Sequence, residues 1–187
     1  MAGNATFHGE RRGSRWSIVV WGAAALLLLL PLAAMQVTDE MDWDLADFVI
    51  FGIMLATACG AYELAARRTG SYAYRAAAGV ALATAFILVW MNLAVGIIGS
   101  EDSPANLMYG GVLAVGIVGA AVARFRPLGM ARALVATALA QALVAVIALV
   151  AGLGFTLVLT GIFMALWLGS AWLFRKAARE QASGAGR

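Results

Sequence analysis

Residues suited to metal or cofactor chemistry are scarce in this chain of 187 residues. It has one cysteine, Cys59, so no disulfide can form within the chain and a paired-cysteine metal site is excluded. Its one histidine, His8, lies in the polar amino-terminal tail. Intramembrane histidine ligands for haem or for a catalytic zinc are therefore excluded as well. We expect no cofactor.

Charged residues are also scarce, at 12% of the chain, whereas hydrophobic residues make up 63%. A soluble domain carries about 25% charged residues, so the composition predicts a polytopic protein in contact with the lipid bilayer. A net charge of +3 would ordinarily suggest nucleic acid as a partner. Here the arginines lie between apolar runs, so we predict that they set the membrane topology and that nucleic acid is not a partner.

Six apolar runs are long enough to cross a bilayer core of about 30 Å. The predicted spans cover approximately residues 16–37, 45–66, 76–99, 104–123, 131–151 and 155–174, with polar tails at 1–15 and 175–187. The sequence thus predicts an all-α bundle of six transmembrane helices with short loops. All of it is expected to form a single integral membrane domain over residues 1–187.

Three of these spans have an alternative interpretation. The first run could belong to a cleaved signal peptide, but the apolar part of such a peptide spans about 7–15 residues. The run 16–37 is longer, so a retained helix is expected. Glycines alone separate the fifth and sixth runs, and these two could therefore be kinked or re-entrant.

Basic residues occur in every second connection along the chain. If the amino terminus is cytoplasmic, all 13 lysines and arginines fall on the cytoplasmic side, as the positive-inside rule requires. Most of the acidic residues then fall on the opposite side. The alternation predicts that both termini are cytoplasmic.

Two helix starts are marked by their capping residues. Asp44 is expected to be the N-cap of the second helix, with Asp47 at the capping-box position three residues later. Ser103 followed by Pro104 is typical of an N-cap and a first helical residue.

The polar stretch at residues 100–106 lies on the predicted outer side. We group its oxygen-bearing residues with two neighbours as a candidate outer polar cluster: Asn92, Glu101, Asp102, Asn106 and Asp47. Such oxygens suit hard cations such as Ca²⁺ or Mg²⁺, so a cation at the outer face is one interpretation. The other is that the acids are solvated and favour the positive end of the following helix. No metal ligand set is assigned.

Four polar residues inside the apolar runs form a candidate intramembrane polar path: Thr84, Asn92, Thr137 and Gln141. An amide in hydrocarbon needs a partner, so we expect these side chains to face one another or a cavity. They indicate either a path for a small polar solute or ordinary hydrogen bonds between helices. Such bonds are common in helix bundles.

The sequence has no Ser/His/Asp or Cys/His set and no Gly-rich phosphate loop, so no enzymatic activity is predicted. Short loops and the small-residue stripe Gly52, Ala56 and Gly60 favour an accessory or assembly component of a membrane complex, bound to other subunits or to its own copies. The alternative is a small transporter or channel for a cation or small polar solute, with an acidic outer mouth.

Residues 90–109, WMNLAVGIIGSEDSPANLMY, resemble a family of small multi-pass bacterial inner-membrane proteins of unknown function. Residues 62–64 and 123–133 are similar to other segments of that family. The resemblance covers spans two to five and implies a location in the bacterial inner membrane. It implies no activity, cofactor or catalytic residue.

Overall fold

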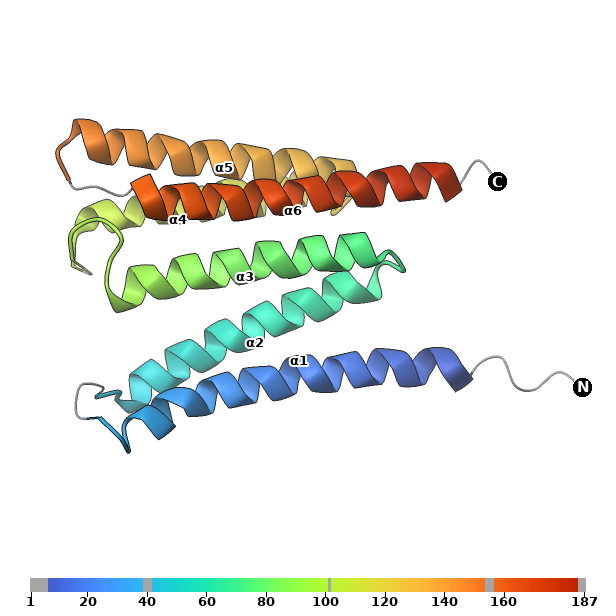
Figure 1. Ribbon diagram of the computed structural model, residues 1–187, viewed down its shortest axis with the longest axis horizontal. Coiled ribbons are helices and arrows are strands. Elements are labelled where there is room, and N and C mark those ends of the chain that lie inside the picture. The colour runs from blue at the N-terminus through green and yellow to red at the C-terminus, as the bar shows by residue number, and fades with distance from the viewer. Residues whose placement is uncertain (1–6, 39–41, 101, 154–156, 185–187) are drawn as a thin grey trace, which may run out of the picture. The chain divides into compact units, whose positions relative to one another are not determined.

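A computed structural model describes the backbone of residues 7–38, 42–100, 102–153 and 157–184, with side chains from residue 17 onward. Within these residues it contains six long helices and no strand (Figure 1). They are α1 (Phe7–Ala34), α2 (Leu45–Arg67), α3 (Tyr72–Ala94), α4 (Met108–Val122), α5 (Pro127–Val150) and α6 (Leu157–Gly184). A short 3₁₀ helix, η1 (Pro104–Leu107), precedes α4. The all-α prediction with six helices is confirmed.

The described helices are long and apolar enough to cross a membrane, with candidate spans of 18 to 28 residues. At 1.5 Å per residue the shortest of these covers about 27 Å, close to the thickness of a bilayer core. The chain is therefore a polytopic membrane protein.

The predicted third span, 76–99, has the wrong limits. The helix begins at Tyr72 and ends at Ala94, and a loop follows. Gly96 (φ 67°) and Gly99 (φ 76°) adopt left-handed backbone conformations that end the helix. Between them, Ile97 and Ile98 are buried. This segment is apolar because it packs inward, not because it continues the span.

Other predicted limits also differ from the helices found. α5 starts at Pro127 rather than near 131, because proline is well suited to the first helical position. α6 continues to Gly184, past the predicted end at 174, because alanine, lysine, arginine and glutamate are good helix formers. α1 begins at Phe7 rather than near residue 16 and ends at Ala34 rather than near 37. α5 and α6 are each continuous helices.

Two compact units make up the chain, Met1–Leu64 and Ala65–Arg187, which we call unit 1 and unit 2. Unit 1 contains α1 and most of α2, and unit 2 contains the end of α2 and all of α3 to α6. The grouping of both units into one domain stays a prediction.

Unit 1 is an antiparallel pair of helices. α2 buries Phe51, Leu55 and Cys59, which recur every four residues along one face. Towards its carboxyl end, the Glu63 carboxylate accepts hydrogen bonds from Ser17 Oγ (2.8 Å) and Trp21 Nε1 (3.2 Å), both on α1.

The predicted capping box at the start of α2 is confirmed. Asp44 N donates to Asp47 Oδ2 (3.0 Å), and Asp47 N donates to Asp44 Oδ1 (3.0 Å). These two bonds satisfy backbone donors that a helix start leaves without partners.

Unit 2 is a bundle of four antiparallel helices, in which α6 packs against α3 and α5, and α5 also packs against α4 (Figure 1). Small residues allow the close approach: a Cβ on Gly119 of α4 would lie 2.7 Å from Ala133 Cβ of α5. A buried hydrogen bond from Ser170 Oγ to Ala77 O (2.7 Å) joins α6 to α3.

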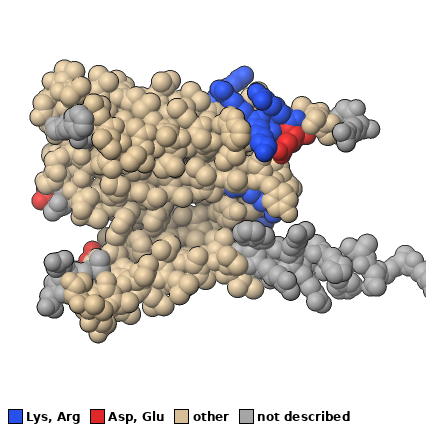
Figure 2. Space-filling model, viewed as in Figure 1, with Lys and Arg blue, Asp and Glu red and all other residues tan. Residues whose placement is uncertain are grey.

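The two ends of unit 2 differ in charge. We call the end where α3 and α5 begin and α4 and α6 end the basic end. Its basic residues include Arg68, Arg75, Arg124, Arg126, Arg132, Arg175, Lys176 and Arg179. Figure 2 shows lysine and arginine side chains gathered where α6 ends, whereas the middle of this face is uncharged in the described part of the chain. The opposite end carries the loop at residues 95–107, which we call the outer loop.

Candidate functional site

Asn106 holds the outer loop together by binding its backbone. Its Oδ1 accepts hydrogen bonds from the N–H groups of Ile97 (3.0 Å) and Ile98 (2.9 Å), and its Nδ2 donates to Ser100 O (2.7 Å). All these bonds use the amide to satisfy the chain's own backbone, so Asn106 has a structural role here.

Ser103 and Pro104 stand where the sequence places them, as N-cap and first helical residue. Two details differ from the expectation. The helix that begins here is the 3₁₀ helix η1, and the Ser103 side chain makes no capping bond. Instead Ser103 O accepts from Asn106 N (3.0 Å).

No hydrogen bond joins the other described members of the predicted outer polar cluster, Asn92, Asp102 and Asp47, to one another, and their grouping stays a prediction. Asp102 is exposed, and Asn92 is half-buried on α3. Asp47 belongs to unit 1, where its carboxylate is used in the capping box. Glu101 lies outside the described residues. Over the residues that are described, no group of three or more His, Cys, Asp or Glu side chains could hold a metal ion.

Two members of the predicted intramembrane path bond to their own helices. Thr84 Oγ1 donates to Val80 O (2.7 Å), and Thr137 Oγ1 donates to Ala133 O (3.0 Å). Both side chains are buried. A hydroxyl bonded to the carbonyl one turn earlier needs no partner on another helix.

The two amides of the path are different. Gln141 has no exposed surface, and neither its Oε1 nor its Nε2 has a hydrogen-bond partner in the described part of the chain. Asn92 Oδ1 is also buried and lacks a partner there. A buried amide without hydrogen bonds costs about 1–3 kcal/mol by protein mutational measures, so a hydrogen-bonding partner for either amide would stabilise the structure.

Sequence reasoning missed two further polar groups on α6. Thr160 Oγ1 and Trp167 Nε1 are buried and have no hydrogen-bond partner among the described residues. The two residues are seven apart and thus lie on one face of the helix. That spacing could have been noticed in the sequence, but only the structure indicates that this face is buried.

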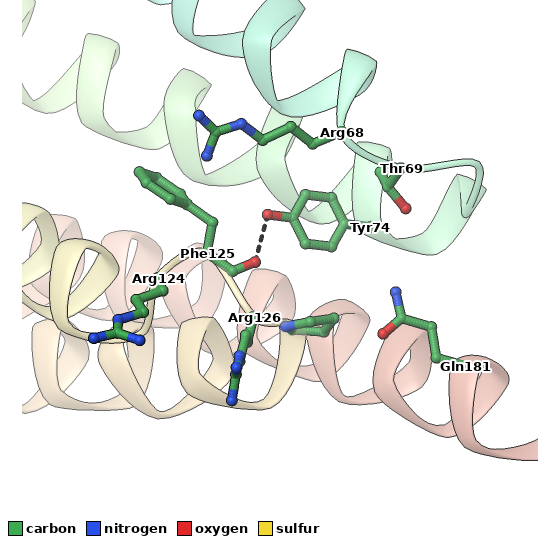
Figure 3. Close-up of a pocket in the computed structure, with 8 residues that line it drawn as sticks. Arg68, Thr69, Tyr74, Arg124, Phe125, Arg126 and Gln181 are labelled. Carbon is green, nitrogen blue, oxygen red and sulfur yellow. Dashed lines mark hydrogen bonds between the residues drawn. The ribbon is translucent and has the colours of Figure 1, made fainter. Parts of the chain in front are cut away.

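A pocket at the basic end was also missed (Figure 3). Its volume is about 250 Å³, and its lining comes from the α2–α3 turn, the start of α3, the α4–α5 connection, the start of α5 and α6. The lining residues are Arg68, Thr69, Tyr74, Arg124, Phe125, Arg126, Pro127 and Gln181. None of them is acidic. The sequence analysis gave the arginines between the apolar runs only a topological role.

Contacts from other helices fix the α4–α5 connection beside this pocket. The Tyr74 hydroxyl on α3 donates to Phe125 O (2.9 Å). The Arg68 guanidinium lies over the Phe125 ring, with its central carbon 5.1 Å from the ring centroid, a cation–π contact. The buried Tyr74 ring in turn packs edge-on against Phe174 of α6, with the centroids 4.9 Å apart.

The backbone of this connection is strained. Arg124 (φ 49°) and Phe125 (φ 59°) are consecutive left-handed residues, and neither is glycine. Such a conformation costs of order 1–3 kcal/mol per residue and persists where surrounding contacts impose it. Here local backbone bonds, including Phe125 N to Ala120 O (3.3 Å), contribute to that constraint together with the hydrogen bond from Tyr74 and the contact with Arg68.

Hydrogen bonds also order the α2–α3 turn on the other side of the pocket. The Arg75 guanidinium donates to Thr69 O from Nε (3.2 Å) and Nη2 (3.0 Å). Ser71 Oγ donates to Glu180 Oε2 of α6 (3.0 Å). The pocket is therefore a positively charged cavity between two ordered connections.

No protein-family model, curated protein or solved structure matches the chain. The resemblance of residues 90–109 to bacterial inner-membrane proteins stays a prediction.

Proposed function

We propose that the chain is a non-catalytic inner-membrane protein of bacteria, with both termini cytoplasmic, that works by associating with other membrane subunits. One observation carries this proposal. α2 buries Phe51, Leu55 and Cys59 on one face, where Cys59 Sγ contacts Val20 O of α1 (3.9 Å), whereas the face bearing Ala56 and Gly60 is exposed.

The exposed face of α2 has the composition of a helix interface. Nothing lies within 4 Å of the Cβ position at Gly60. Lipid tails gain little from a small-residue surface, but a second helix can approach it closely and gain van der Waals contacts. Gly52, the third residue of the predicted stripe, instead faces α1, with Leu28 Cδ1 3.9 Å from its Cβ position.

Purification from native membranes in mild detergent tests the association. The wild-type chain is expected to co-purify with another membrane protein at fixed stoichiometry, identified by mass spectrometry. Gly60→Leu is expected to lose that protein, because the added side chain separates the helices. Gly22→Leu is the matched control, since Gly22 on α1 is also exposed with nothing within 4 Å of its Cβ position. A wild-type monomer or homo-oligomer would contradict the proposal.

A specific observation also supports a second candidate function, passage of a cation or small polar solute through unit 2. Gln141 of α5 and Thr160 and Trp167 of α6 are buried polar residues without hydrogen-bond partners in the described chain. α5 and α6 pack against each other. A passing solute would supply the hydrogen bonds that these groups lack.

Flux into proteoliposomes separates the two functions. Transport predicts wild-type uptake of a cation or small polar solute above that of empty vesicles and uptake near background for Gln141→Leu. The leucine variant is expected to fold at least as well, because it removes a buried amide that has no partner. Thr137→Val, which alters a hydroxyl bonded within its own helix, should keep its flux. Absence of wild-type uptake would exclude this candidate.

A further inference from the structure

We propose that the basic-end pocket binds the phosphate of an anionic phospholipid headgroup. The proposal is independent of the two functions above, because it rests on other residues.

The side chains around the pocket favour a small anion. Arg68, Arg124 and Arg126 line it, and no carboxylate does. Guanidinium groups bind phosphate oxygens through pairs of parallel N–H bonds. The volume of about 250 Å³ lies below the roughly 300–1,000 Å³ of pockets for drug-sized ligands. A headgroup phosphate therefore suits it better than a nucleotide.

Backbone groups add positive potential at the same place. α5 begins at the pocket with Arg126 as N-cap and Pro127 as first helical residue, and the Arg126 side chain makes no capping bond. Pro127 carries no N–H and Arg126 N donates to Ala123 O (3.0 Å), so the contribution at the pocket is the partial positive charge that the helix dipole places at this end. Anions bind readily at such a position. The three arginines and the start of α5 thus favour the same kind of ligand.

The surface around the pocket indicates that the anion is attached to a lipid. Val122, Phe125 and Leu128, at the end of α4 and the start of α5, are 79%, 43% and 49% exposed. A free phosphate would leave this apolar surface uncovered. A phospholipid would place its phosphate in the pocket and its acyl chains along these residues, at the level where α4 and α5 leave the bilayer. Basic pockets between helix ends are a known mode of anionic lipid binding.

The strained connection fixes the backbone from which two of the arginines extend. Arg124 and Arg126 flank Phe125, whose carbonyl and ring are fixed by Tyr74 and Arg68. This arrangement places two arginines of one short connection near a third, Arg68, from the α2–α3 turn (Figure 3). In Figure 3 the guanidinium groups of Arg124 and Arg126 extend away from Tyr74, so binding of a phosphate requires both side chains to rotate towards it.

Native mass spectrometry of the full chain tests the proposal. The protein is exchanged into mixtures of phosphatidylglycerol and phosphatidylcholine at about 0.5 M NaCl, where the Debye length is only a few Å and diffuse surface attraction is weak. One phosphatidylglycerol is expected to stay bound in preference to phosphatidylcholine. Replacing Arg68, Arg124 and Arg126 with glutamine is expected to weaken its binding by about a hundredfold, at about fivefold for each arginine.

The matched control removes the same charge from the same end of unit 2. Arg175, Lys176 and Arg179 are exposed on α6 and do not line the pocket, so their triple replacement with glutamine should change binding by less than about twofold. An equal loss in both triple variants would overturn the proposal, because it would indicate diffuse attraction. Equal retention of the two lipids by the wild type would also overturn it.

A competition experiment distinguishes a lipid ligand from a soluble phosphate compound. Inorganic phosphate at about 10 mM is expected to leave phosphatidylglycerol bound, and displacement of the lipid would assign the pocket to a soluble phosphate compound instead. Circular dichroism checks that the variants fold. If the pocket triple variant fails to fold, Arg68→Gln alone decides the question, with about fivefold weaker binding expected and unchanged binding overturning the proposal.

Discussion

The two loops that join α3 to α4 and α4 to α5 lie at opposite ends of unit 2, and different contacts hold them. In the outer loop, one residue, Asn106, makes three hydrogen bonds to backbone groups of the same loop. In the connection at residues 123–127, local backbone bonds such as Phe125 N to Ala120 O (3.3 Å) and Arg126 N to Ala123 O (3.0 Å) are joined by contacts from outside, from Tyr74 and Arg68. The side-chain contacts of the outer loop are local, whereas those of the basic-end connection come from distant parts of the chain.

The left-handed backbone positions show the same contrast. The outer loop places glycines there, Gly96 and Gly99, which adopt positive φ at little steric cost. The basic-end connection has Arg124 and Phe125 at these positions, where positive φ costs free energy because neither residue is glycine. Side chains are retained at these strained positions, and those side chains line the pocket. The outer loop therefore has a structural role, whereas the basic-end connection holds arginine side chains beside the pocket.

The largest expected effect is that of Asn106→Ala. The substitution leaves the N–H groups of Ile97 and Ile98 without their acceptor, and Ile98 is only 1% exposed. A buried donor without a partner costs about 1–3 kcal/mol, so the free energy of unfolding should fall by about 3 kcal/mol. Denaturant titration of the detergent-solubilised protein, followed by circular dichroism, measures it.

Two controls sharpen this result. Asn106→Asp keeps an acceptor for both N–H groups and loses only the donor to Ser100 O, so a loss of about 1 kcal/mol is expected. Asp102→Asn, on an exposed residue of the same loop, should change stability by less than about 0.5 kcal/mol. Equal losses for Asn106→Ala and Asp102→Asn would contradict a local origin of the loop's order.

Gly129→Ala probes the basic end with a somewhat smaller effect. The added Cβ would lie 2.7 Å from Ala123 Cβ and 3.2 Å from Ala123 Cα. Neither atom can move without shifting the connection, so a loss of about 2 kcal/mol is expected, as for other overpacked sites. Thermal unfolding in detergent measures it.

The matched control for Gly129→Ala is Gly111→Ala on α4. Nothing lies within 4 Å of the Cβ position at Gly111, so alanine there should leave stability unchanged or raise it by up to about 1 kcal/mol through its higher helix propensity. Similar losses in both variants would mean that the close contact with Ala123 carries no cost. The basic-end connection would then be less constrained than its geometry indicates.

Features that depend on residues close together in the chain could be predicted from the sequence. Six spans follow from composition and length, and the Asp44–Asp47 capping box follows from a spacing of three. The end of α3 is mispredicted, because apolar residues such as Ile97 serve equally in a span and in a buried loop. The basic-end pocket could not be predicted, since Tyr74 and Phe125 are 51 residues apart in the chain. No local pattern specifies which helix supplies the donor for a given carbonyl.

Tyr74→Phe is expected to have the smallest effect on stability, and it tests the contrast between the two loops most selectively. It removes only the hydroxyl that donates to Phe125 O and keeps the ring packed on Phe174. One hydrogen bond contributes about 1 kcal/mol, so stability should fall by about that amount, with faster amide exchange at Phe125 and Arg126. Tyr72→Phe is the control, because Tyr72 lies on the same helix and is 69% exposed. If neither stability nor amide exchange distinguishes the two variants, the connection holds its own conformation, as the outer loop does. A selective loss in Tyr74→Phe would instead mean that α3 imposes the strained backbone which positions Arg124 and Arg126.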